Sequence, residues 1–106
     1  MDTAALIAKY EGLLKQRPDD ELLHFSLGKA CFDAGRLDDA EEQLYAALEK
    51  KPDWMIVTML LAKIALQRHD KAGAKALYEK GLELAIAQEH DGPAEECRAA
   101  LAALQT

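Results

Sequence analysis

The sequence predicts an all-α protein built from stacked antiparallel helix hairpins. Its 106 residues are enough for one domain, and because half of them are hydrophobic and 30% are charged, the chain can bury a core and keep a polar surface. Good helix formers dominate, whereas only three prolines and six glycines interrupt them. An internal repeat with a period of 34 residues indicates how these helices are arranged.

The repeat is visible when the chain is compared with itself at a shift of 34 residues. The positions that match include Pro18 and Pro52, Asp19 and Asp53, Leu27 and Leu61, Lys29 and Lys63, and Ala40 and Ala74. One further helix upstream joins the series, because Leu14 aligns with Leu48 and Leu82. The first helix is therefore expected to be the second half of a truncated repeat.

Breaks in the hydrophobic periodicity predict six helices, over residues 3–16, 20–34, 37–51, 54–68, 71–88 and 93–105. Pro18 ends the first helix, because the residue before a proline avoids the α region. Asp19 or Asp20 caps the second helix. Gly35 closes it, because glycine tolerates the left-handed conformation that commonly ends a helix.

The later helices follow the same signals. Asp38 lies in the first turn of the third helix, where a carboxylate favours the positive end of the helix dipole. Pro52 repeats the break after the third helix, and Asp70 starts the fifth. A loop over 89–92 precedes the sixth helix, in which Pro93 suits the first helical position.

Small and apolar residues in the first full repeat form a recognisable pattern of Leu27, Gly28, Ala40, Leu44, Ala47 and Pro52. This pattern resembles the tetratricopeptide repeat, a helix–turn–helix unit of the same length. The resemblance implies an α-solenoid of about 2.5 repeats plus a C-terminal capping helix, in a single domain over residues 1–106. The half repeat would cover 3–16, the full repeats 20–51 and 54–88, and the capping helix 93–105.

The second full repeat follows the pattern less closely. The residues that fit are Leu61, Ala62, Ala74, Tyr78 and Gly81. Ile86 stands in place of the terminal proline, so the fifth helix is expected to run on. These departures indicate a divergent repeat.

Charge and composition argue against several classes of partner. The formal net charge is -6, and no basic stripe is present that could neutralise phosphates, so nucleic acid and anionic membrane surfaces are not expected. The start of the chain lacks the features of a signal peptide, and the apolar run from Trp54 to Leu66 is too short to span a bilayer. Two cysteines without a secretion signal do not suggest a disulfide framework. We therefore expect a cytoplasmic protein.

Signals of catalysis are also missing from the sequence, and we predict that the protein is not an enzyme and has no cofactor and no metal. His24, His69 and His90 are scattered, and no histidine or cysteine pair has the spacing of a metal site. Pairs of carboxylates lie at helix starts, where the helix dipole explains them. An enzyme would need, for example, His24 beside a solvent-accessible Cys31.

The resemblance implies that partners bind on the concave face, which is lined by the first helix of each hairpin. The expected partner-binding residues are Leu22, Phe25, Lys29, Phe32 and Asp33 in one repeat, and Ile56, Met59, Lys63, Leu66 and Gln67 in the next. Helical spacing gives independent support, because Phe25, Lys29 and Phe32 recur at i, i+4 and i+7 and so share one stripe.

The two lysines indicate the chemistry of the partner. Neighbouring helices pack about 8–10 Å apart, and an extended peptide advances about 3.3 Å per residue, so acidic groups about three residues apart could meet both Lys29 and Lys63. The alternative is that these are ordinary surface lysines and that the C-terminal helix folds back over the groove and fills it.

The predicted function is that of a protein–protein interaction module, or adaptor, which binds a peptide or helix of a partner protein, with an acidic segment as one candidate. The rival prediction is a self-association module in which the apolar helix 54–66 pairs between chains. The helix over 54–66 is apolar on nearly all sides, and such a helix is either buried or has one face that binds a partner. The chain would then be a monomer or a weak homodimer.

Overall fold

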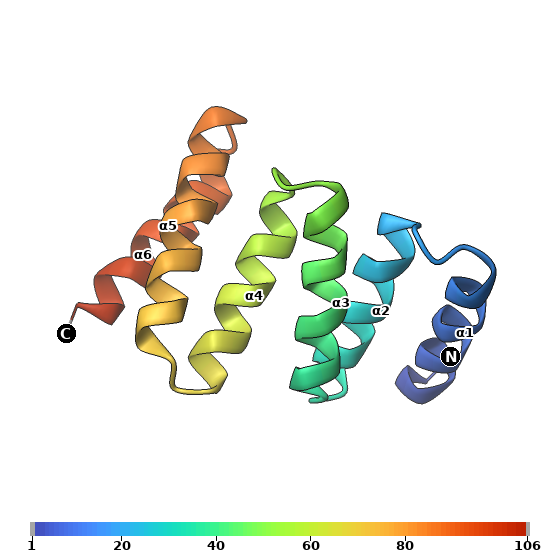
Figure 1. Ribbon diagram of the computed structural model, residues 1–106. Coiled ribbons are helices and arrows are strands. Elements are labelled where there is room, and N and C mark those ends of the chain that lie inside the picture. Colours follow the sequence, from blue (N-terminus) through green and yellow to red (C-terminus); the bar gives the residue numbers. More distant parts are fainter. Residues whose placement is uncertain (1, 106) are drawn as a thin grey trace. The chain divides into compact units, whose positions relative to one another are not determined.

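The computed structural model describes residues 2–105, and these residues form helices and no strands (Figure 1). The prediction of an all-α fold of helix hairpins is confirmed. The helices are α1 (Thr3–Gln16), α2 (Glu21–Asp33), α3 (Leu37–Lys50), α4 (Met55–Gln67), α5 (Lys71–Ala87) and α6 (Asp91–Leu104).

The chain divides into two compact units after Pro52. In the first unit, α2 packs against both α1 and α3, and in the second unit α5 packs against both α4 and α6 (Figure 1). Each unit is therefore three helices in which the middle one has a neighbour on two sides. The assignment of all 106 residues to a single domain stays a prediction.

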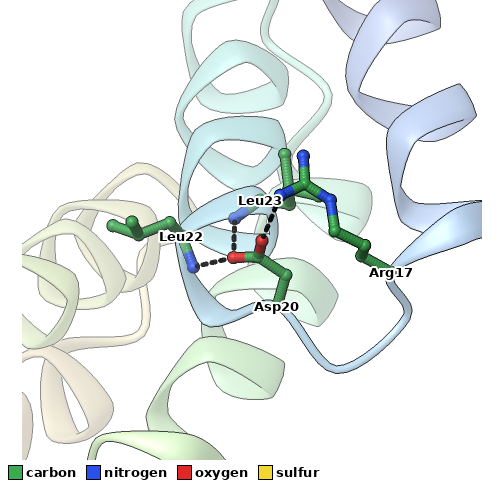
Figure 2. A network of polar contacts seen from close by, with 4 residues as sticks. All are labelled: Arg17, Asp20, Leu22 and Leu23. Atoms are coloured by element: carbon green, nitrogen blue, oxygen red, sulfur yellow. Dashed lines mark hydrogen bonds and ion pairs between the residues drawn. The ribbon is translucent and has the colours of Figure 1, made fainter.

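Aspartate side chains fix the starts of three helices. Asp2 caps α1, Asp20 caps α2 and Asp70 caps α5, each by accepting hydrogen bonds from backbone N–H groups in the first turn. Figure 2 shows the α2 cap, in which Asp20 Oδ1 accepts from the N–H groups of Leu22 and Leu23 at 3.0 and 3.2 Å. The second oxygen of Asp20 lies 3.4 Å from Arg17 Nη1 (Figure 2). Of the two aspartates that the sequence offered for this role, Asp20 is therefore the one that caps.

The sixth helix begins earlier than predicted. It starts at Asp91, and Pro93 is its third residue and not its first. Proline is compatible with this position because the first four N–H groups of a helix have no partner within the helix. A proline near a helix start therefore marks the first turn but does not fix the first residue.

Three helices end in the same left-handed turn, at Gly35 (φ 77°), His69 (φ 60°) and Glu89 (φ 58°). In each turn the next N–H group donates to the carbonyl five residues before it, at 2.9 Å, which is the Schellman pattern. His69 occupies the position of Gly35 in the following repeat. Only the first of the three turns therefore has the residue that the conformation prefers.

Exchanging residues at these turns should change stability in opposite directions. We expect His69→Gly to raise the free energy of unfolding by up to about 1 kcal/mol, because it removes the Cβ atom that the left-handed conformation disfavours. Gly35→Ala should lower it by about 1 kcal/mol for the same reason. Urea unfolding followed by circular dichroism measures both, and a change of the same sign in both variants would contradict the assignment.

The hairpin of α2 and α3 is held at close range by a glycine. A Cβ atom placed on Gly28 would lie 2.9 Å from Cγ and Cδ2 of Leu44 and 3.3 Å from its backbone nitrogen. Leu44 and Ala40 of α3 are fully buried at this contact. The small residue at Gly28 therefore allows α2 and α3 to approach closely.

Alanine at Gly28 should be destabilising even though alanine favours helix. We expect Gly28→Ala to lower the free energy of unfolding by about 1–3 kcal/mol, because Leu44 must move. The control is Gly12→Ala in α1, where a Cβ atom would meet nothing within 4 Å. This variant should gain up to about 1 kcal/mol from helix propensity alone. Equal effects of the two substitutions in thermal unfolding would show that the α2–α3 contact is not tight.

In the second unit, α4, α5 and α6 meet around Gly81. A Cβ atom there would lie 3.3 Å from Cys97 Sγ of α6 and 3.3 Å from Met59 Cγ of α4. Both side chains belong to the buried cluster of this unit. The side chain of Gln88, just after α5, donates to the backbone carbonyl of Asp53 at 2.9 Å, which connects the end of α5 to the segment before α4.

Candidate functional site

The first unit has an open hollow of about 210 Å³ between α1 and α2, which we call the α1–α2 hollow. Its lining is mostly apolar, with polar atoms from a serine and an ion pair. The residues that line it are Leu6, Tyr10, Phe25, Ser26, Lys29, Ala30 and Asp33. Its residues come from two helices that pack together.

Helical spacing explains why these residues share a surface. Lys29 lies four residues after Phe25, three after Ser26 and four before Asp33, so these side chains follow one stripe along α2. A second stripe of α2, which contains Leu27, is buried in the core. From α1, Leu6 and Tyr10 are also four residues apart, and each is partly buried.

The polar part of the hollow is an internal ion pair. Lys29 Nζ lies 3.2 Å from each carboxylate oxygen of Asp33, one turn further along α2. The two side chains are 49% and 51% exposed, so solvent screens the attraction and the pair adds little to stability. Lys29 is therefore a compensated cation at the edge of an apolar surface.

The structure brings together only part of the predicted site in the first repeat. Phe25, Lys29 and Asp33 line the hollow, whereas Leu22 and Phe32 do not. Leu22 is 62% exposed on the first turn of α2, and Phe32 is partly buried.

In the second repeat, Met59 is not on an open face. It is 4% exposed and packs in the core with Cys97 of α6, so the expectation that it contacts a partner is corrected. The reason is that α6 packs on α5 and brings Cys97 next to Met59 at Gly81. For Met59, the C-terminal helix therefore covers the position, as the alternative prediction stated.

The other predicted residues of the second repeat remain at least partly accessible. Ile56 is 44% exposed and Leu66 is 38% exposed, Gln67 is exposed, and Lys63 is partly buried. These side chains stay candidates for contact with a partner.

Four residues of the hollow were not predicted from the sequence, namely Leu6, Tyr10, Ser26 and Ala30. The prediction took only the first helix of each full hairpin, so it left out α1. The spacing of Leu6 and Tyr10 by one helical turn was the available signal. Recognising it would have required the knowledge that α1 and α2 leave a space between them.

The pairing of His24 with a solvent-accessible Cys31 is not formed. Cys31 is 1% exposed, and burial raises the pKa of its thiol above the ordinary value. His24 uses Nε2 to donate to the carbonyl of Pro18 at 2.8 Å, and its Nδ1 lies 2.7 Å from Gln43 Oε1. Within residues 2–105, no group of three or more His, Cys, Asp or Glu residues could hold a metal ion.

Burial of three weak acids should make the protein less stable in alkali. Burial raises the pKa of Cys31, Cys97 and Tyr78, with the carboxylate of Glu96 adding to the effect on the last two. Since these pKa values are higher in the folded state, the stabilisation is complete below the unfolded thiol pKa of about 8.5 and is lost as pH rises through the folded values. We expect the free energy of unfolding, measured with urea under reducing conditions, to fall as pH rises above about 8.5 for the thiols and above about 10 for Tyr78. The Cys31→Ala, Cys97→Ala double variant should show a shallower fall, and an unchanged slope would contradict this cause.

The helices and the hollow together define a helical-hairpin repeat protein with an apolar, partly charged surface depression. A family model described as tetratricopeptide repeat matches residues 2–64. TPR repeat-containing protein PA0015 of Pseudomonas aeruginosa is 36% identical over 77 residues, which are 73% of this chain and 73% of that protein. The chain belongs to the tetratricopeptide repeat family.

Solved structures agree with this assignment. The solution structure of protein BPP2914 from Bordetella parapertussis matches with a TM-score of 0.83 and 30% identity, over 94% of this chain and 87% of that one. The crystal structure of PcrH in complex with the chaperone binding region of PopD matches with a TM-score of 0.86, over 93% of this chain and 75% of that one. At 21% identity, this structural match shows a shared fold and nothing more.

Membership of the family gives a coarse functional class. Tetratricopeptide repeats are typically non-enzymatic, and their fold suggests protein–protein interaction. Within the part of the chain that the structure describes, no helix has the length and apolarity needed to cross a membrane. A cytoplasmic location stays a prediction.

Proposed function

We propose that this protein is an interaction module that binds a segment of a partner protein on the α2 face of its first unit, with the α1–α2 hollow as the anchor point. The observation that supports this proposal best is the hollow itself. It is apolar and open, its edge holds a half-exposed ion pair, and it lies along the first helix of a hairpin. Pockets that combine an apolar lining with a few polar groups are the usual form of a binding site.

A structural neighbour gives a precedent for the fold. PcrH has been crystallised in complex with the chaperone binding region of PopD, so a protein of similar fold accommodates a segment of another protein. The present chain spans most of that structure, and its hollow could receive one side chain of such a segment. Leu22, which is large, apolar and exposed on the same helix, would extend the contact.

The predicted acidic partner depends on Lys29 and Lys63 acting together. Lys29 is already paired with Asp33, so a ligand carboxylate would have to compete with an intramolecular one. Lys63 is partly buried on α4. The proposal therefore places the main contact at the apolar lining and leaves the charge of the segment to be determined by charge reversal.

The proposal is tested by removing one wall of the hollow. Phe25→Ala should weaken binding about tenfold or more, because truncation of a buried aromatic anchor commonly costs more than 1.4 kcal/mol of binding free energy. The partner is first captured from a lysate of the native source and identified by mass spectrometry. Its affinity for purified wild-type and variant chains is then measured by calorimetry.

Tyr45→Ala is the matched control, since it removes an exposed ring on α3 that does not line the hollow. Circular dichroism confirms that both variants are folded. If Phe25→Ala and Tyr45→Ala bind the partner as well as the wild type does, the proposed site is wrong.

The alternative function, self-association through the apolar helix 54–66, is supported by fewer side chains than the sequence suggested. Nine residues of α4 are buried, and only Ile56 and Leu66 of its large apolar residues are exposed. Light scattering over a range of concentrations distinguishes the two functions. A mass that stays at 11.7 kDa supports the adaptor, and a rising mass supports self-association.

A further inference from the structure

The size and charge of the α1–α2 hollow specify its occupant more narrowly than the proposed function does. We propose that the hollow takes one large apolar side chain, aromatic or branched aliphatic, from a partner segment that has arginine or lysine next to that side chain. This inference rests on the proposed function, and it adds the chemistry of the ligand.

The volume sets the first condition. A cavity of about 150 Å³ lined by apolar side chains holds a benzene molecule, and this hollow has about 210 Å³. One phenyl, indole or leucine side chain therefore fits inside the hollow. Tyr10 and Phe25 supply aromatic rings from α1 and α2, and such rings bind another aromatic ring in offset or edge-to-face geometry.

The ion pair at the edge sets the second condition. Two donors of the Lys29 ammonium group are directed at Asp33, so the positive charge next to the hollow is already compensated. Each oxygen of Asp33 retains a second lone pair, and the carboxylate is half exposed. A guanidinium or ammonium group of the ligand can therefore join the carboxylate without displacing Lys29.

The surroundings favour a cation over an anion. Residues 1–52 contain seven lysines and arginines against eleven aspartates and glutamates, so the first unit has a negative field that attracts basic segments. Tyr10 and Phe25 also line the hollow, and aromatic rings attract cations, arginine most often. An acidic segment would gain neither contribution. It could still meet the remaining N–H group of the Lys29 ammonium, but the net negative charge of the first unit would repel it.

A displayed library of random twelve-residue peptides tests this inference, because it does not impose a ligand. The full chain is used for selection, and the recovered peptides are then synthesised and titrated against wild-type and variant chains. We expect sequences with one aromatic or branched aliphatic residue and arginine or lysine beside it.

Three variants separate the parts of the inference. Ser26→Phe, which places a ring inside the hollow, should weaken binding of the selected peptides about tenfold or more. Asp33→Lys should weaken it about three- to tenfold and leave peptides without a basic residue unaffected. Tyr45→Ala, outside the hollow, should change nothing, and circular dichroism with thermal unfolding shows that each variant is folded.

Each other outcome overturns a defined part. Peptides that bind wild type and Ser26→Phe equally would show that the hollow is not the site, although binding of a protein segment would stand. Selected peptides with acidic flanks, or tighter binding by Asp33→Lys, would overturn the charge assignment alone. Recovery of no peptide, together with a concentration-dependent mass, would overturn both the inference and the proposed function in favour of a second copy of this chain.

Discussion

The close contact between α2 and α3 is the constraint on which the first unit depends. With no side chain at Gly28, Leu44 can rest against the backbone of α2, and the two helices become one rigid hairpin. That contact fixes which side of α2 faces the core. The opposite stripe, with Phe25, Lys29 and Asp33, is then necessarily presented to α1 and to solvent. The candidate site is therefore a consequence of packing on the far side of the same helix.

The same logic explains why the two units differ. At the repeat position of Gly28 the second unit has Ala62, and at the position of Leu44 it has Tyr78, both buried. A small residue is instead needed at Gly81, where side chains of α4 and α6 converge. The second unit thus uses Gly81 of α5 to let side chains of α4 and α6 meet. Met59, which would otherwise be open to a partner, becomes part of that core.

The helices could be predicted from the sequence because their signals are local. Asp20 and Gly35 act on groups within one turn of themselves, and the repeat then fixes the order of the helices. The site was predicted only in part. The stripe on α2 follows from helical spacing, but the contribution of Leu6 and Tyr10 depends on how α1 lies against α2, and no local pattern states that distance. The burial of Met59 depends in the same way on the path of α6.

The distribution of the cysteines has a practical consequence. The first unit contains Cys31 and the second contains Cys97, and both are free thiols that are shielded from solvent. A thiol reagent can modify either one only when the helices around it separate for a moment. The labelling rates of the two cysteines, measured by mass spectrometry of the peptides, would therefore report local opening of each unit independently. Each unit of the native sequence thus contains one buried thiol whose labelling rate reports local opening. The rate at Cys97 reports how often α6 separates from the helices around it.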